Sequence, residues 1–306
     1  MARSFLTLKD LSREDLFAIF EKARVLKADL KQKKAIDVLR NKVVGILFEK
    51  PSTRTRASFE AAALRLGGQT VYLSSSELQL KRGEPVKDTA RVLGSYMDIL
   101  VARVYNHQTV EELAQYSGIP VINGLSEFAH PTQAVCDLFT ILEVKGNLEE
   151  LTLAYIGDGN NVCHSLLLCC ALAGMNMVAA CPKGYYPHAD ILKNAQRIAE
   201  KTGSNIVVVE DPKNAAEGAD ILYTDVWVSM GEEEEKAKKL KVFQGYQINA
   251  ALLKTAAKNA LVMHCLPAYR GLEITDDMME GPQSIVWQQG ENKMHGAAAI
   301  LDFFLS

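Results

Sequence analysis

The segment Pro51-Ser52-Thr53-Arg54-Thr55-Arg56 lies between an apolar run, residues 43–48, and a helix-like run, residues 57–64. The first run predicts a buried strand and the second a helix. The proline ends the strand, because it cannot continue a ladder of hydrogen bonds. Hydroxyl side chains next to it are suited to cap the helix. Helix amides and guanidinium groups at one turn predict a phosphate site. A capped helix with two solvated arginines is the alternative interpretation of the same residues.

Strands alternate with helices along the whole chain, which indicates parallel sheets with helices on both faces. Predicted strands lie at 43–48, 71–73, 99–104, 120–123, 153–156, 177–180, 206–209, 221–224, 261–264 and 284–286. The predicted fold class is α/β, with two doubly wound open parallel-sheet domains and the active site in the cleft between them. We expect a first domain at 1–130, an interdomain helix at 131–147, a second domain at 148–289, and a last helix at 290–306 that returns to the first domain.

Composition excludes several classes of protein. The 306 residues are 48% apolar and 23% charged, as in ordinary globular proteins, and the net charge of −3 predicts no affinity for nucleic acid or an anionic membrane. The longest apolar run, residues 166–175, is too short to cross a bilayer, and the first ten residues do not resemble a signal peptide. Six cysteines without a CxxC pair favour reduced thiols and a cytoplasmic protein.

Polar candidates gather where the predicted strands end, which is where ligands bind in open α/β sheets. His130 and Gln133 lie one helical turn apart at a helix start, and Arg103 ends a strand. Together they are donors suited to polarise a carbonyl oxygen. A single histidine such as His130 is more often a structural hydrogen-bonding residue than a catalyst. Without the other donors, a salt bridge to a nearby acid would be the favoured interpretation of Arg103.

The glycine-containing segment Gly157-Asp158-Gly159-Asn160-Asn161 invites a dinucleotide-binding interpretation. It fits poorly, because Val162 occupies the position of the third glycine and no acidic residue ends the next strand. An oxidoreductase is therefore kept only as the alternative class.

Two later segments carry further candidates. Asp225 ends a strand before Trp227, Ser229 and Met230, where a carboxylate attracts an ammonium group or caps the loop. The pair His264-Cys265 has no other ligand at zinc spacing, so we expect no metal. Neighbours on a strand face opposite sides, so His264 is not expected to serve Cys265 as a base. Pro267 is a candidate for a cis peptide bond.

Four motifs together resemble the aspartate/ornithine carbamoyltransferase family, from about Phe5 to Leu305. They are Ser-Thr-Arg-Thr-Arg at 52–56, His-Pro-Thr-Gln at 130–133, Asp-Val-Trp-Val-Ser-Met-Gly at 225–231 and His-Cys-Leu-Pro at 264–267. The last two are typical of its ornithine-specific members. The resemblance implies transfer of the carbamoyl group of carbamoyl phosphate to the δ-amine of L-ornithine, giving L-citrulline and phosphate, without a metal or organic cofactor.

The resemblance also implies roles for individual residues. Catalytic roles fall to Asp225, Cys265, Arg103 and His130. Carbamoyl phosphate would be bound by Ser52, Thr53, Arg54, Thr55, Gln79, Arg103, His130, Gln133, Cys265, Leu266 and Lys293. Ornithine would be bound by Asn161, Asp225, Ser229 and Met230. The family is trimeric, so we expect a homotrimer in which Gln79 reaches the neighbouring subunit's site.

Some questions stay open on the sequence. Lys293 stands where the family usually carries arginine, and it keeps the charge without the bidentate fork. A catalytically silent relative that binds carbamoyl phosphate is therefore an alternative, as is a carbamoyltransferase for putrescine or an acylated ornithine. Arginine biosynthesis and citrulline catabolism would use the same residues. Arg56 lies beyond the predicted phosphate contacts, and we expect it in a structural salt bridge.

Overall fold

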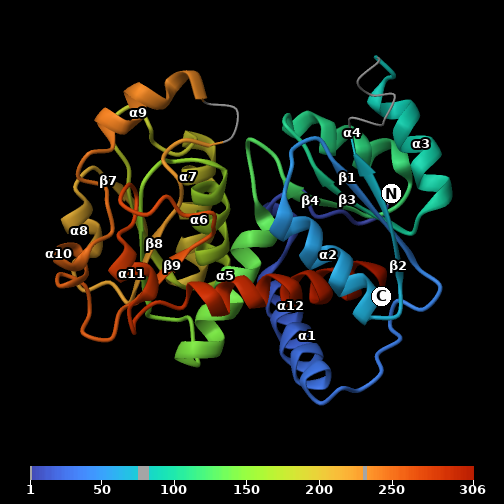
Figure 1. Ribbon diagram of the computed structural model, residues 1–306, viewed down its shortest axis with the longest axis horizontal. Coiled ribbons are helices and arrows are strands. Elements are labelled where there is room, and N and C mark those ends of the chain that lie inside the picture. Colours follow the sequence, from blue (N-terminus) through green and yellow to red (C-terminus); the bar gives the residue numbers. More distant parts are fainter. Residues whose placement is uncertain (1, 75–82, 230–232) are drawn as a thin grey trace. The chain divides into compact units, whose positions relative to one another are not determined.

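A computed structural model of the chain describes residues 2–74, 83–229 and 233–306 (Figure 1). These residues form two compact units, each built on one sheet. Unit 1 comprises Met1–Phe139 and Glu291–Ser306, and unit 2 comprises Thr140–Gly290. Every pairing between strands of either sheet is parallel, so the predicted class of two parallel-sheet α/β domains is confirmed.

The sheet of unit 1 has the strand order β2-β1-β3-β4. Its strands are β1 (Val43–Phe48), β2 (Gln69–Ser74), β3 (Ile99–Arg103) and β4 (Val121–Leu125). The chain order reverses between β1 and β3, where Phe48 pairs with Arg103. Such a reversal opens a crevice at the carboxyl ends of the strands, and that is the usual ligand position.

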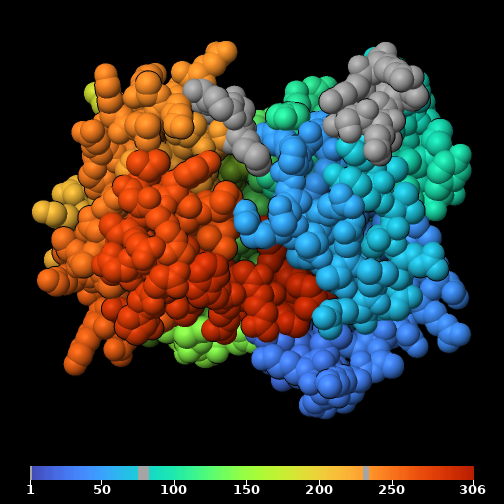
Figure 2. Space-filling view, in the orientation of Figure 1, coloured from blue at the N-terminus to red at the C-terminus, as the bar shows by residue number. Residues whose placement is uncertain are grey.

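Helices of unit 1 begin at polar caps and bury apolar faces. In α1 (Arg13–Lys31), Ser12 and Asp15 form a reciprocal capping box, and Leu16, Ile19 and Phe20 are buried. The other elements are η1 (Leu8–Asp10), α2 (Thr53–Arg65), α3 (Val86–Tyr96) and α4 (His107–Ser117). The residues of α2, light blue, reach the surface on the face of unit 1 shown in Figure 2.

Two long helices contribute to both units along the chain, α5 (Pro131–Lys145) and α12 (Val286–Leu305). Within unit 1 they approach closely at a glycine. A Cβ atom on Gly296 would lie 2.3 Å from the Sγ atom of Cys136. Only glycine therefore allows α12 to come this near to α5.

The sheet of unit 2 has the order β7-β6-β5-β8-β9. Its strands are β5 (Thr152–Ile156), β6 (Asn176–Ala180), β7 (Ile206–Val209), β8 (Ile221–Thr224) and β9 (Leu261–His264), and its helices are α6 (Asn161–Ala173), α7 (Ala189–Thr202), α8 (Pro212–Ala216), η3 (Glu233–Glu235), α9 (Lys236–Val242), α10 (Ala250–Leu253) and α11 (Asp276–Glu280). Here the order reverses between β5 and β8, so the loops after these two strands border the crevice.

One predicted strand, at 284–286, is wrong. Ser284 makes only an isolated bridge to Val262, and α12 already begins at Val286. A short apolar run has no period long enough to distinguish a strand from the start of a helix. Among the described residues, no helix has the length and hydropathy needed to cross a bilayer.

Candidate active site

The turn from β1 into α2 has the geometry of an anion site. Ser52 is the N-cap of α2, in extended conformation, and its hydroxyl accepts the Thr55 amide at 3.3 Å. Thr53 is exposed, Arg54 half-buried and Thr55 buried. The first turn of this thirteen-residue helix therefore presents unpaired amides, and Arg54 belongs to that turn.

Arg56 is engaged elsewhere, as predicted. Its Nε atom lies 3.0 Å from Glu60 Oε1, and its guanidinium stacks over the ring of Tyr72, 3.5 Å from the centroid. The exposed side chain is therefore part of a structural contact of α2.

Buried cations surround His130 in unit 1. The exposed fractions of Arg103, His130 and Lys293 are 6%, 4% and 8%. Burial lowers the pKa of His130 well below its usual range, and the charges of Lys293 and Arg103 lower this pKa further. His130 is therefore a neutral imidazole near neutral pH, which donates or accepts a hydrogen bond without adding charge.

Gln133 follows His130 by one helical turn, and its amide is held on both sides. Nε2 donates to Asp137 Oδ1 at 2.8 Å, and Oε1 accepts from Lys293 Nζ at 2.6 Å. The predicted residues Arg103, His130, Gln133 and Lys293 thus gather in one unit, together with Asp137, which the sequence did not single out.

Asp225 is the centre of the polar groups in unit 2. Its Oδ1 accepts the Val226 amide at 2.8 Å and the Cys265 thiol at 2.9 Å, and its Oδ2 accepts Asn160 Nδ2 at 2.9 Å. Asp225 is 6% exposed, and Asn160 also caps α6. The carboxylate therefore lies at the sheet reversal of unit 2 with three donors holding its position.

The segment after β9 is braced by buried polar groups. His264 Nδ1 accepts the Leu266 amide at 2.9 Å, and its Nε2 lies 3.1 Å from Glu273 Oε1. One ring nitrogen of His264 nevertheless lies within 4.8 Å of the Cys265 sulfur, so the expectation that the two side chains face opposite sides is wrong. The thiol donates to Asp225, and both ring nitrogens of His264 are engaged with Leu266 and Glu273. The Leu266–Pro267 bond is cis, as predicted, and Leu266 has a φ of 58°, which is uncommon for a bulky residue.

The same segment forms a cluster of metal-ligand type. Atoms of Asp225, His264 and Cys265 that could bind a metal lie within 4.8 Å of one another. Both nitrogens of His264 are already engaged, so the imidazole has no lone pair to offer without rearrangement. This donor set does not fit a tetrahedral zinc site.

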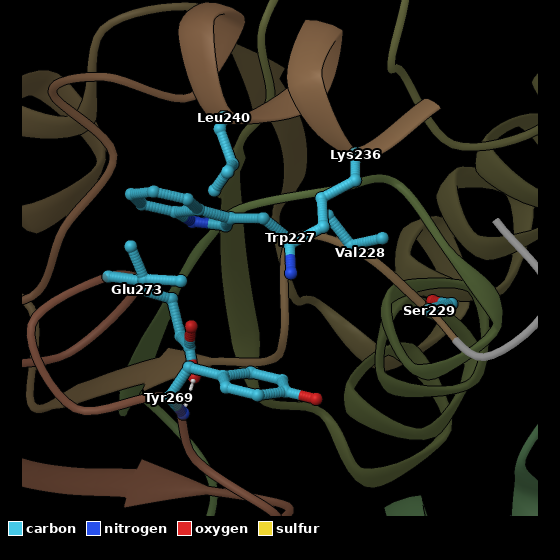
Figure 3. A pocket seen from close by; sticks show the side chains of 8 residues that line it. Trp227, Val228, Ser229, Lys236, Leu240, Tyr269 and Glu273 are labelled. Atoms are coloured by element: carbon cyan, nitrogen blue, oxygen red, sulfur yellow. Dashed lines mark hydrogen bonds between the residues drawn. The ribbon is translucent and has the colours of Figure 1, made fainter. Parts of the chain in front are cut away.

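A cavity of about 130 Å³ backs the loop after β8 (Figure 3). The side chains of Trp227, Leu240 and Tyr269 line it from three segments, and Ser229 lies at the end of the described loop. Nearby, Lys239 of α9 forms a buried ion pair with Asp158 at 2.6 Å. This pair connects α9 to the loop after β5, which also carries Asn160.

The remaining predicted residues are distributed between the two units. Leu266 and Ser229 are half-buried, and Asn161 begins α6 next to the cap Asn160. Gln79 and Met230 lie outside the described residues. Sequence reasoning missed Asn160 and Asp137. Asparagine before a helix is a recognisable cap, but nothing in the sequence indicated that its amide would bind Asp225.

Comparisons with known proteins identify the family of the chain. Residues 3–143 match the carbamoyl-P binding domain of aspartate/ornithine carbamoyltransferases, and residues 149–304 match the Asp/Orn binding domain. The chain belongs to the aspartate/ornithine carbamoyltransferase family.

Within that family its relatives are ornithine carbamoyltransferases. One from Archaeoglobus fulgidus is 50% identical over 299 residues, which cover 98% of this chain and 96% of the relative. One from Pyrococcus furiosus, described as anabolic, is 46% identical, with coverage of 98% and 95%. A solved structure of ornithine carbamoyltransferase from Pyrococcus furiosus has a TM-score of 0.95 at 46% identity, covering 98% of this chain and 96% of that chain.

Proposed function

We propose that this chain is an ornithine carbamoyltransferase, which transfers the carbamoyl group of carbamoyl phosphate to the δ-amine of L-ornithine and releases L-citrulline and phosphate. The observation that carries the proposal is that each unit has its own polar site at the ends of its strands, and that the two sites differ in charge. Unit 1 has a helix start with buried cations and a neutral imidazole, and unit 2 has a held carboxylate. The relatives act on ornithine by name.

In this proposal, unit 1 binds carbamoyl phosphate. Ser52, Thr53, Arg54 and Thr55 hold the phosphate end, since amides and a guanidinium share its charge and make it a better leaving group. Arg103, His130 and Gln133 donate to the carbamoyl oxygen, with Lys293 beside them and Cys265 and Leu266 bordering the carbon. Each donor to the developing oxyanion is worth about 3 kcal/mol in comparable sites.

Ornithine is the nucleophile. Its neutral δ-amine attacks the carbamoyl carbon, a C–N bond forms, and the C–O bond to phosphate breaks as the tetrahedral intermediate collapses. Asp225 and Ser229, with Asn161 and Met230, hold the α-amino and α-carboxylate groups. Asp225, hydrogen-bonded to Cys265, orients the amine or accepts its proton. Bringing both substrates into line supplies much of the remaining rate.

The biological setting forms part of the proposal. The anabolic relative favours synthesis of arginine over catabolism of citrulline. Six free cysteines suit a reducing cytoplasm. The family resemblance supports a homotrimer in which Gln79 reaches the neighbouring site, and light scattering of the purified protein tests the trimer. A mass near three chains is expected, and a monomer would contradict it.

A colorimetric citrulline assay tests the reaction directly. Purified protein is given carbamoyl phosphate with L-ornithine, putrescine or N-acetylornithine. We expect citrulline from ornithine and little carbamoylation of the other two amines. Carbamoylation of putrescine without citrulline, or a dependence of activity on NAD, would overturn the proposal. Phosphate binding without any turnover would indicate a silent relative.

A further inference from the structure

The Gln133 amide lies between two charged side chains of opposite sign. Asp137 accepts from its nitrogen at 2.8 Å, and Lys293 donates to its oxygen at 2.6 Å. The exposed fractions of Gln133, Asp137 and Lys293 are 2%, 0% and 8%. Because all three side chains are buried, these contacts compete little with water.

Helix geometry brings the three residues together. Gln133 and Asp137 are four residues apart on α5 and so share one face. Lys293 comes from α12, which meets α5 at the close approach of Gly296 and Cys136. The Cys136 thiol also lies 3.9 Å from the carbonyl oxygen of Lys293. The interhelical approach therefore sets the distance over which the lysine reaches the amide.

The two neighbours impose the same orientation on the amide. A carboxylate only accepts hydrogen bonds, and an ammonium group only donates them. A flipped amide would set its NH2 group against the ammonium and its oxygen against the carboxylate, so both contacts would become repulsive. In the observed orientation the nitrogen keeps a second N–H, and the oxygen keeps a second lone pair, for contacts with a substrate.

We propose that Asp137 is a positioning residue for carbamoyl transfer: with Lys293 it fixes the orientation in which the Gln133 amide contacts the carbamoyl group of the substrate. This role rests on the proposed function. Asp137 itself does not touch the substrate. A single ammonium is enough for the lysine's part, because Gln133 offers one carbonyl oxygen.

The binding of two small anions distinguishes this positioning role from a general loss of structure. Phosphonoacetamide carries a carboxamide group joined to a phosphonate through one methylene, whereas inorganic phosphate has no carboxamide. Calorimetry on the full chain compares their binding to wild type and Asp137→Leu. We expect the Kd of phosphonoacetamide to rise about tenfold in the variant, since one hydrogen bond is lost or misdirected. The Kd of phosphate should stay within about twofold, and kcat for citrulline should fall at least tenfold.

Matched variants complete the test. Asp137→Asn keeps an acceptor oxygen and should restore the phosphonoacetamide Kd to within about threefold of wild type. Thr140→Val removes another fully buried polar group of α5 and should lower stability without changing the ratio of the two Kd values. Should Asp137→Leu not fold, Lys293→Met replaces it. Loss of the lysine charge should raise the Kd of both anions. Any additional rise in the Kd of phosphonoacetamide measures the effect of the amide orientation.

An unchanged ratio in Asp137→Leu or Lys293→Met would overturn the role of Asp137, as would an equal loss for phosphate in Asp137→Leu. Wild-type protein that makes no citrulline would instead count against the proposed function. The two failures are therefore distinguishable.

Discussion

Both units are built on a parallel sheet whose strand order reverses, but the residues at the two reversals differ in charge. In each, the strand order reverses once, and polar loops follow the two strands at the reversal. In unit 1 those positions carry Arg54 and Arg103, and the charge of Arg103 acts on the neutral His130. In unit 2 they carry Asp225 and its donor Asn160. A common backbone scaffold thus leaves the choice of ligand charge to a few side chains at the strand ends.

The two polar sites also differ in how charge is held. Asp225 receives three hydrogen bonds, and the neighbouring Asp158 has its own buried partner in Lys239. In unit 1, Arg103 and Lys293 act together on His130, and their charges add to the effect of burial on its pKa. Unit 1 is therefore prepared to attract an anion, whereas the carboxylate of unit 2 is already organised.

The largest effect should come from Arg54→Ala, which removes the guanidinium at the helix start of unit 1. A hydrogen bond between charged groups is worth about 1.5–3 kcal/mol, so the KM for carbamoyl phosphate should rise, or kcat fall, by roughly 10- to 100-fold or more. Steady-state citrulline kinetics measure this, with circular dichroism as the check on folding. Wild-type turnover in a folded variant would remove Arg54 from the phosphate site.

Asp225→Asn tests unit 2 by itself. The amide oxygen can still accept from Val226 and Cys265, but the negative charge is lost. We expect the KM for ornithine to rise, or kcat to fall, by about tenfold or more, because the α-ammonium group of ornithine loses the negative charge opposite it. Phosphate binding, measured by calorimetry, should not change. Asp211→Asn is the control, since asparagine caps α8 as well as aspartate does. An unchanged response to ornithine would separate Asp225 from substrate binding.

The sequence predicted much of this because periodicity and turn chemistry are local. The helix start at Ser52 and the strand end at Arg103 follow from propensity, proline and apolar periodicity. The period of two in strands did not keep His264 apart from Cys265, because the chain turns at the end of β9 and the regular alternation stops there. The strand at 284–286 failed because a short apolar run lacks a decisive period.

Contacts between distant segments could not be predicted in this way. No local pattern in the sequence indicates that Lys293 contacts Gln133, 160 positions away, or that Lys239 pairs with Asp158. Both depend on how helices pack, and the first depends on a single glycine facing Cys136. Candidate site residues were therefore predictable as a set at strand ends, but their partners were not.

The buried imidazole of His130 in unit 1 should make the free energy of unfolding depend on pH. The pKa of His130 is lowered in the folded state relative to the unfolded value near 6.5. Below about pH 6.5 the imidazole is therefore protonated in the unfolded chain but still neutral in the folded chain. Stability should fall on acidification, with a share from His130 of up to about 1.4 kcal/mol per pH unit. His130→Gln should lose that share. Melting temperatures between pH 7.5 and 5.0 measure it, and parallel curves for both proteins would show that His130 is not held neutral.

The smallest effect should come from Arg56→Ala, although Arg54 and Arg56 stand only two residues apart in the same turn of α2. Two helical positions apart, their side chains leave α2 in nearly opposite directions. Arg56 binds Glu60 and stacks over Tyr72, so its guanidinium is engaged in a contact of α2 with its surroundings. Exposed ion pairs contribute little, so we expect kcat/KM within about twofold of wild type and a slightly lower melting temperature. A loss of activity comparable to that of Arg54→Ala, with the KM for carbamoyl phosphate raised, would mean that both arginines hold the phosphate and that the contact with Glu60 breaks when the substrate binds.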